Sequence, residues 1–367
     1  MRIRTAVGGL GALFAASLLA SLMAGCASPA TQATTGAPSS DQSSTATGPA
    51  GFDAANARGL VSEQTAREQA LSVLLGFAES PDPQIRANAI EALSMVPRRA
   101  ESAIRRGLVD QNEGVRAVSA LAAGRAGLPE LAAFLRPLSR DRASTVRVSA
   151  IAGLVLIGEP VDRTPIATVL LTDPAPRARA QAAFVLGELG DASAVQLLRQ
   201  AAMTDIPRGE PGAVRSMRLQ VAEALVKLGD EDAVQEIRAA LYPSRPEELE
   251  FAALAAQILG NVKDEASAGQ LITLTAFRSG GRLMPAEVRL AAAGSLALLG
   301  REEGWFIADG YAADASAVIR SQAAHVYGRT RGGDNLAKLA IMLEDSSPLV
   351  RVAAASGMLE QTTAGRS

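Results

Sequence analysis

The chain has 367 residues, of which 48% are hydrophobic, and its 36 Lys and Arg nearly balance its 38 Asp and Glu. A nucleic-acid binder usually carries a basic excess, so we expect no nucleic-acid partner. One cysteine and one histidine are present. These counts exclude a disulfide framework within the chain and a zinc site built from the usual Cys and His ligands.

Residues 1–25 have the pattern of a secretory signal: basic residues near the start, an apolar run and small residues before Cys26. Residues 22–26 resemble the lipobox of bacterial lipoproteins, whose cysteine is lipidated and becomes the mature N-terminus. The resemblance implies a lipid anchor at Cys26. Because Ala27 rather than aspartate follows, it also implies the outer membrane of the cell envelope, facing the periplasm. A single membrane-spanning helix is the alternative, since about 20 apolar residues can cross a bilayer.

Residues 26–58 are rich in Ser, Thr, Ala, Gly, Pro and Gln and have almost no large apolar side chain. Such a segment cannot bury enough surface to fold, so we expect a disordered tether after the lipidated cysteine. Its typical reach is on the order of 30 Å. The folded part would then lie just off the membrane, attached through the lipid anchor only.

Between residues 85 and 358 the chain repeats one short pattern nine times. Complete copies have an arginine, small or apolar residues three, six and seven positions later, and a glycine at the eleventh position. The copies begin at Arg86, Arg116, Arg147, Arg179, Arg218, Leu249, Arg289, Arg320 and Arg351. A fixed period of about 31 residues marks a stack of supersecondary units, each too small to bury its apolar face alone. We predict an all-α solenoid over residues 59–361 and a disordered tail over residues 362–367.

Each unit is predicted to be a helix A, a turn and a helix B. Pro83, Pro176 and Pro348 each lie three residues before the repeat arginine, where a first helical residue needs no N–H. The glycine at the eleventh position fits a left-handed cap at the end of helix B. No window alternates apolar and polar residues long enough to predict a strand.

This pattern resembles the HEAT-like repeats first recognised in phycobilisome lyases, over roughly residues 60–360. The residues that carry the resemblance include Asp141, Val146, Arg147, Ala150, Leu154 and Gly158, then Asp173, Arg179, Ala182, Leu186 and Gly190. The resemblance implies a helical superhelix but no single activity, because such repeats serve lyases, hydroxylases and plain scaffolds.

The sequence contains no catalytic constellation that we can identify. Deoxyhypusine hydroxylase, a di-iron enzyme with these repeats, takes its metal ligands from His-Glu steps, whereas the single histidine here, His325, is followed by Val326. The patterns of a phosphate loop and of a Ser-His-Asp triad are missing. We expect no catalytic residue, no metal ligand and no cofactor, and we interpret His325 as a surface residue of helix B.

The recurring arginines are accompanied by aspartates. The residues of the predicted ladder are Arg116, Arg147, Arg179, Arg218, Arg289, Arg320 and Arg351, with Asp110, Asp141, Asp173, Asp314 and Asp345, each of which lies six residues before an arginine. We predict a ladder of charge-assisted hydrogen bonds that fixes each turn. A cationic ridge for an acidic polymer is the alternative.

Helix B positions two, five and nine after the arginine are expected to face outward on the concave side. They are polar in the fourth and fifth units and apolar in the sixth, which predicts a protein-binding groove there. The candidate partner-binding residues are Phe251, Leu254, Ile258, Leu298, Gln220, Glu223, Gln322 and His325. Alternatively, the superhelix tightens at this point or an insertion covers it.

Two longer intervals place insertions at residues 204–213 and 277–285, both between helix A and helix B. Insertions on one edge of a solenoid are often functional, and tolerated loop growth is the alternative. Three functions remain open. The first is a monomeric, non-catalytic adaptor that binds an envelope protein or peptide on its concave face. The second is a lyase-type or other accessory enzyme subunit. The third is an envelope structural protein that contacts the cell wall.

Overall fold

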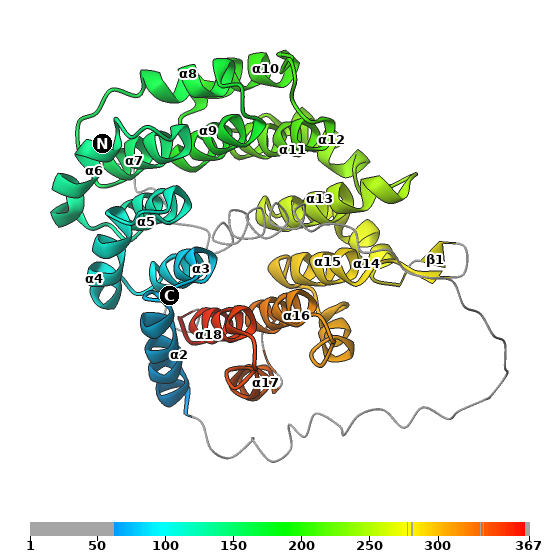
Figure 1. The fold of residues 1–367 in the computed structure, drawn as a ribbon. Coiled ribbons are helices and arrows are strands. Elements are labelled where there is room, and N and C mark those ends of the chain that lie inside the picture. The colour runs from blue at the N-terminus through cyan, green and yellow to red at the C-terminus, as the bar shows by residue number, and fades with distance from the viewer. Residues whose placement is uncertain (1–61, 277, 280–281, 331, 333, 364–367) are drawn as a thin grey trace, which may run out of the picture.

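The computed structural model describes residues 62–276, 278–279, 282–330, 332 and 334–363 (Figure 1). The predicted signal segment, the lipidation site Cys26 and the predicted tether lie outside these residues. Within the described part, none of the helices combines the length and the apolar character needed to cross a bilayer.

The described residues form nine consecutive helix pairs, as the repeat spacing predicts. The pairs are α2 (Glu63–Phe77) with α3 (Pro83–Leu93), α4 (Pro97–Leu108) with α5 (Glu113–Arg125), α6 (Ala132–Leu138) with α7 (Ser144–Leu156), α8 (Thr164–Thr172) with α9 (Pro176–Leu189), α10 (Val195–Met203) with α11 (Pro211–Lys227), α12 (Val234–Ala239) with α13 (Leu249–Asn261), α14 (Ala268–Ala276) with α15 (Ala286–Leu298), the 3-10 helix η9 (Trp305–Gly310) with α16 (Ala317–Arg329), and α17 (Asn335–Met342) with α18 (Pro348–Thr363). Short 3-10 turns precede some helices, namely η4 (Pro129–Leu131), η5 (Ala192–Ala194), η6 (Glu231–Ala233), η7 (Pro246–Glu248) and η8 (Glu265–Ser267).

The boundaries of these helices follow from local chemistry. Pro83, Pro176 and Pro348 are the first residues of α3, α9 and α18, where the missing N–H costs nothing. Gly158 and Gly229 end α7 and α11 with positive φ angles of 82° and 91°, a conformation that other residues adopt only with strain. The N–H after each glycine bonds a carbonyl five residues back, which satisfies the last turn of the helix.

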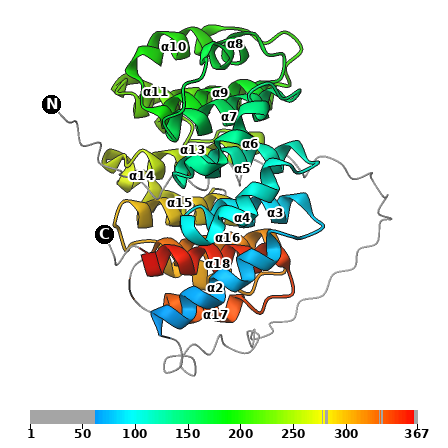
Figure 2. The same ribbon diagram turned by 90° about the vertical axis from the view of Figure 1, so that its left-hand side faces the viewer.

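The helices form two layers that curve into a ring. The helices B pack against one another on the inside, and the helices A cover them on the outside (Figures 1 and 2). The first helix, α2, packs against the last, α18, and α18 also contacts α3. The predicted solenoid therefore closes on itself, a feature that the repeat period alone does not indicate.

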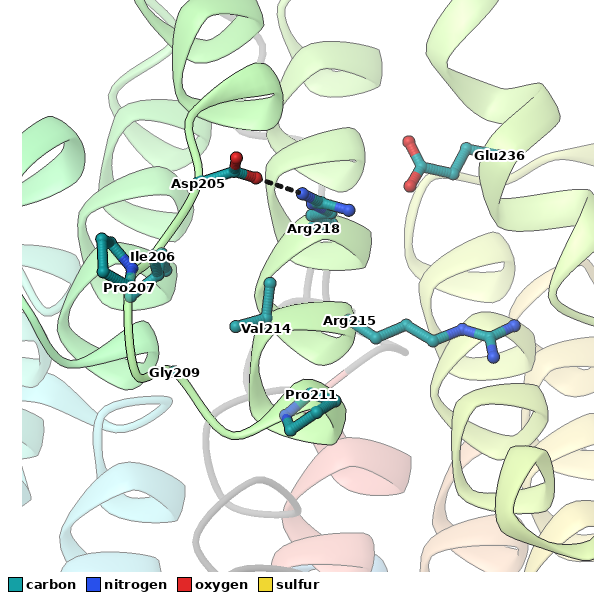
Figure 3. Close-up of a pocket in the computed structure, with 9 residues that line it drawn as sticks. All are labelled: Asp205, Ile206, Pro207, Gly209, Pro211, Val214, Arg215, Arg218 and Glu236. Carbon is teal, nitrogen blue, oxygen red and sulfur yellow. Dashed lines mark ion pairs between the residues drawn. The ribbon is translucent and has the colours of Figure 1, made fainter.

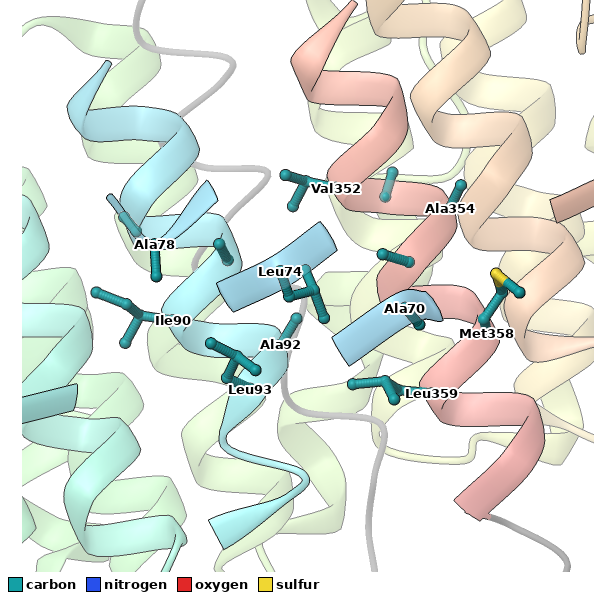
Figure 4. Packing of buried hydrophobic residues seen from close by; sticks show 14 of the residues in the cluster. Ala70, Leu74, Ala78, Ile90, Ala92, Leu93, Val352, Ala354, Met358 and Leu359 are labelled. Atoms are coloured by element: carbon teal, nitrogen blue, oxygen red, sulfur yellow. The ribbon is translucent and has the colours of Figure 1, made fainter. Parts of the chain in front are cut away.

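The contact between the two ends is a hydrophobic core. Ala70 and Leu74 of α2 lie between side chains of α3 and α18, among them Leu93 and Leu359 (Figure 4). Leu74 is fully buried, at 0% exposure. At the rim of this contact the Arg67 guanidinium donates a hydrogen bond of 2.8 Å to Thr363 Oγ1.

Small residues on the helices B explain the tight curvature. A Cβ atom added at Gly328 of α16 would lie 2.5 Å from the Cα of Gly357 in α18. At Gly153 of α7 it would lie 2.5 Å from the carbonyl oxygen of Ala120 in α5. Because these inner helices approach at backbone distance, the inner layer is narrower than the outer one, and the stack bends inward.

Both insertions lie between a helix A and a helix B. The first joins α10 to α11, and the second joins α14 to α15. The second contains a small antiparallel hairpin, β1 (Arg278–Ser279) with β2 (Arg282–Leu283), in which Ser279 pairs with Arg282. The sequence pattern does not predict this hairpin, which leaves the fold all-α.

Candidate functional site

The helix B positions that were predicted to face a partner, at two, five and nine residues after the repeat arginine, point toward the inside of the ring. The predicted apolar groove among them is not exposed. Phe251 and Leu254 are 6% exposed and Ile258 is 0% exposed. These side chains belong to a hydrophobic cluster to which the helices α11 to α15 all contribute. The Arg215 guanidinium covers Phe251 at 4.6 Å from the ring centre. The prediction of an open groove over the sixth unit is therefore wrong, because packing with the neighbouring helices buries these positions.

The polar members of the stripe do not face open solvent either. Gln220 and Glu223 are 5% and 3% exposed, and Glu223 lies 2.9 Å from the Lys227 ammonium. Leu298, Gln322 and His325 are partly buried. Burial lowers the pKa of His325 to about 3, and Arg329 acts in the same direction. The interpretation of His325 as an ordinary surface residue is therefore wrong.

Charged side chains inside the ring pair with one another. Arg125 of α5 donates to Glu188 of α9 at 2.8 Å, and Lys227 of α11 lies 3.1 Å from the same carboxylate. Burial raises the pKa of Glu188, but the two cations outweigh burial and hold it below its usual value. This cluster links three helices B and stabilises the ring, so it offers no row of solvated side chains for a partner.

The repeat arginines and aspartates meet across neighbouring units rather than within one unit. Arg116 donates from Nε and Nη2 to both carboxylate oxygens of Asp141 at 3.0 and 3.1 Å. Its Nη1 donates to the carbonyl oxygens of Asp110 and Gln111 at 2.9 and 3.0 Å. Two further pairs have the same geometry, Arg86 with Asp110 and Arg320 with Asp345. In these rungs an arginine pairs with the aspartate of the following unit.

Other repeat arginines make different contacts. Arg147 donates to the carbonyl oxygens of Asp141 and Arg142, Arg179 to that of Asp173, Arg289 to that of Thr275 and to the Tyr311 hydroxyl, and Arg351 to the carbonyl oxygen of Leu343. Asp173 and Asp314 accept main-chain N–H groups of their own turns. The ladder is thus complete between the first and second, second and third, and eighth and ninth units, and the other repeat arginines do not form this paired rung.

The interruption leaves the guanidinium of Arg218, in the fifth unit, without a carboxylate at hydrogen-bond distance. Tyr242 and Pro243 occupy the positions at which the ladder aspartate of the next unit would stand, and neither can accept as a carboxylate does. Arg218 Nε is buried and has no hydrogen-bond partner among the described residues. Its nearest carboxylate, that of Asp205, is 3.7 Å away and belongs to a side chain that is 94% exposed.

A different arginine bridges the fifth and sixth units. Arg215 pairs with Glu248 at 3.2 Å, and the Ser244 N–H donates to the same carboxylate at 2.7 Å. The main-chain bond from Ser244 and the neighbouring Arg245 and Arg215 lower the pKa of Glu248 to about 2. Because Arg215 and Glu248 already join the two units, Arg218 is not needed for that purpose.

A cavity of about 530 Å³ opens beside Arg218, between the first insertion, α11 and α12 (Figure 3). Apolar walls come from Ile206, Pro207, Pro211 and Val214, and charged side chains from Asp205, Arg215, Arg218 and Glu236. In Figure 3, Arg218 projects between Asp205 and Glu236, while Arg215 points toward α13. The first insertion therefore forms one wall of a cavity.

Apolar side chains are exposed on the edge that carries the turns from helix A to helix B. Met203 at the end of α10 is 84% exposed, Tyr242 just after α12 is 62% exposed, and Leu283 in the second insertion is 41% exposed. These residues belong to the fifth, sixth and seventh units. Met203 and Tyr242 follow Arg179 and Arg218 at the same sequence separation that Asp110 has from Arg86. Exposed apolar groups thus replace the ladder carboxylates at the interruption.

Comparison with known families agrees with this architecture. The sequence model for HEAT repeats matches residues 71–156 and 163–256. These two segments are built of HEAT repeats. The matched segments run from the first unit into the sixth, and the helix pairing continues from there to α18, which completes the solenoid. A search of curated protein sequences finds no match.

Solved structures with similar helical stacks share little sequence with this HEAT-repeat chain. The CpcE–CpcF complex of phycocyanin lyase from Nostoc sp. PCC7120 is 16% identical, with a TM-score of 0.39, over 74% of this chain and 97% of that one. Human deoxyhypusine hydroxylase is 22% identical, with a TM-score of 0.35, over 73% of this chain and 98% of that one. An engineered protein is 15% identical, with a TM-score of 0.30, over 84% of this chain and 97% of that one. These likenesses say nothing about activity.

The sequence reasoning missed Met203, Tyr242, Arg215 and the cavity. A signal for Met203 and Tyr242 was available, because no aspartate stands at the ladder position after Arg179 or Arg218. Arg215 and the cavity had no such signal, since they depend on how the insertion folds and how the units stack. Among the described residues, no three His, Cys, Asp or Glu side chains are grouped as metal ligands.

Proposed function

We propose that this HEAT-repeat protein is a non-catalytic scaffold that binds a protein or peptide partner at the cell envelope. The observation that carries the proposal is the edge of the fifth to seventh units. There an interrupted charge ladder, exposed apolar side chains and a cavity occur together. Exposed apolar groups beside polar ones are typical of protein-binding surfaces.

The helix B positions that face the inside of the ring are buried. We therefore place the proposed binding surface on the edge of the ring. Phe251 and Leu254 are held in a hydrophobic cluster and have little surface to offer. Met203 and Tyr242 project from equivalent positions of adjacent repeats, which lie about 10 Å apart in a helical stack. A partner segment that runs along the edge could contact both side chains, and we expect the protein to act as a monomer.

The envelope location is supported by the sequence at the N-terminus. Arg2, Arg4, the apolar run and Leu22–Cys26 form the pattern of a lipoprotein signal. Lipidation at Cys26, with the polar segment up to residue 58 as a tether, would hold the ring near the outer membrane. Metabolic labelling with a radioactive fatty acid tests this point: the wild-type chain should incorporate label and Cys26→Ser should not. Label that persists in Cys26→Ser would refute the anchor.

Photo-crosslinking in intact cells tests the binding surface. A photoreactive phenylalanine analogue replaces Tyr242 in one variant and Val109 in another. Val109 is a matched control, because it is 68% exposed on the same edge but adjoins Asp110, whose rung is complete. We expect a discrete cross-linked protein with the analogue at position 242 and none at position 109. Equal products at both positions, or none at position 242, would contradict the proposed surface.

A further inference from the structure

We propose that Arg218 binds a carboxylate of the partner, which takes the place of the aspartate that is missing from this rung of the ladder. The proposal rests on the scaffold function above and specifies the chemistry of the partner. The carboxylate belongs either to an Asp or Glu side chain or to a C-terminal residue, because both present the same pair of oxygens to a guanidinium.

The complete rungs show what this guanidinium lacks. In each of them an arginine donates from Nε and Nη2 to the two oxygens of one carboxylate, at distances of 2.7 to 3.1 Å. Arg218 begins the fifth repeat at the equivalent position, yet its Nε is buried and makes no hydrogen bond among the described residues. A buried donor left without an acceptor destabilises the folded state. The Arg218 side chain as a whole is 41% exposed, so a partner carboxylate that binds this guanidinium would supply the charged acceptor that the rung lacks.

The charged neighbours of the cavity limit what can bind. Asp205 is a weak competitor, since its contact of 3.7 Å involves a 94% exposed side chain that water screens. Glu236 lies on the opposite wall (Figure 3). Two carboxylates at the rim disfavour a polyanion or a phosphate dianion. They tolerate a single carboxylate that reaches Arg218 between them.

The apolar part of the surface specifies what surrounds that carboxylate. Ile206 and Val214 form the wall of the cavity next to Arg218, and Met203 and Tyr242 are exposed on the same edge. A peptide with one carboxylate between apolar side chains matches this arrangement. A run of acidic residues does not, because additional carboxylates would meet Asp205 and Glu236.

Fluorescence anisotropy with defined peptides tests the proposal on the purified full-length protein. The probes are three labelled peptides that share an apolar sequence: one with a central aspartate and an amidated end, one with a central asparagine and a free C-terminal carboxylate, and one with a central asparagine and an amidated end. We expect at least one carboxylate peptide to bind, and about tenfold more tightly than the uncharged one. Comparison of the first two identifies the source of the carboxylate.

Three variants localise the binding. Arg218→Gln should lose the preference for the carboxylate peptide. Tyr242→Asp should lose it as well, because it supplies an acceptor at the vacant position of the ladder. Val109→Asp adds the same charge beside a complete rung and should bind like the wild type. Circular dichroism and thermal melting show whether each variant is folded.

Equal binding of charged and uncharged peptides, binding of no peptide, or full binding by a folded Arg218→Gln would each overturn the proposal. These outcomes are separable from failure of the scaffold function. If position 242 cross-links a protein in cells while the carboxylate preference is missing, the scaffold function stands and Arg218 is not the receptor. If cross-linking also fails, both proposals fall.

Discussion

Two arginines at the same repeat position, Arg116 and Arg218, should differ greatly in their contribution to stability. Arg116 is 10% exposed and makes four hydrogen bonds, two of them to Asp141, which is 11% exposed. Replacement of Arg116 by Gln leaves this mostly buried carboxylate without its cation. Removal of one member of a buried ion pair costs about 3–5 kcal/mol, and partial exposure reduces this to about 2–4 kcal/mol.

Arg218→Gln should cost at most about 1 kcal/mol. The Arg218 side chain is 41% exposed, and its nearest carboxylate is at 3.7 Å on an almost fully exposed Asp205, so little stabilisation is lost. Urea denaturation followed by circular dichroism compares the two variants with the wild type. Hydrogen exchange then shows whether the loss in Arg116→Gln is concentrated in α5 and α7, as expected for a stack with nearest-neighbour interfaces. Equal losses in the two variants would refute the distinction between complete and interrupted rungs.

Three further outcomes are expected. Tyr242→Asp should raise the free energy of unfolding by about 1–2 kcal/mol, because it gives Arg218 a charged acceptor, whereas Val109→Asp should give no gain in the same urea titration. Leu74→Ala should lower it by about 2–5 kcal/mol, because Leu74 is 0% exposed between α3 and α18, and Phe306→Ala, at 57% exposure, serves as the mild control. Burial raises the pKa of Glu360 to about 7, against the opposing effect of Arg329. The stabilisation linked to this group is therefore complete below about pH 4.5 and is lost as the pH rises through 7, by up to about 3 kcal/mol. Glu360→Gln should remove this part of the pH dependence, and an unchanged profile would show that Glu360 does not titrate in this range.

The helix pairs could be predicted from the sequence because their signals are local. Pro83 begins α3, and Gly158 and Gly229 end their helices with positive φ, since these residues meet steric demands within a single turn. The pairing of arginines with aspartates is also encoded in the repeat. The partner carboxylate, however, belongs to the following unit rather than to the turn just before the arginine, and this depends on how successive units stack.

Ring closure could not be predicted in the same way. It depends on a small bend at each interface, such as the approach of Gly328 to Gly357, added over the whole stack until Leu74 meets Leu359. Periodicity identifies which face of a helix is apolar, but it does not fix the total bend that the interfaces add up to. The prediction of the partner-binding residues was wrong for that reason. Phe251 and Leu254 were assigned to an open concave face, whereas they are buried between neighbouring helices.

Closure of the ring determines which surface a partner can reach. The distance between the first helix, α2, and the last helix, α18, is the most direct test of that closure. Spin labels at positions 67 and 363, in a Cys26→Ser background, mark α2 and the end of α18, whose side chains are hydrogen-bonded in the structure. Pulsed electron paramagnetic resonance should give one narrow distribution centred below about 25 Å, allowing about 10 Å for each label and its neighbouring helix. An open stack of the same units, at about 10 Å for each layer, would place the labels roughly 80 Å apart. A broad or long distribution would contradict closure and return the concave face to consideration as the binding surface.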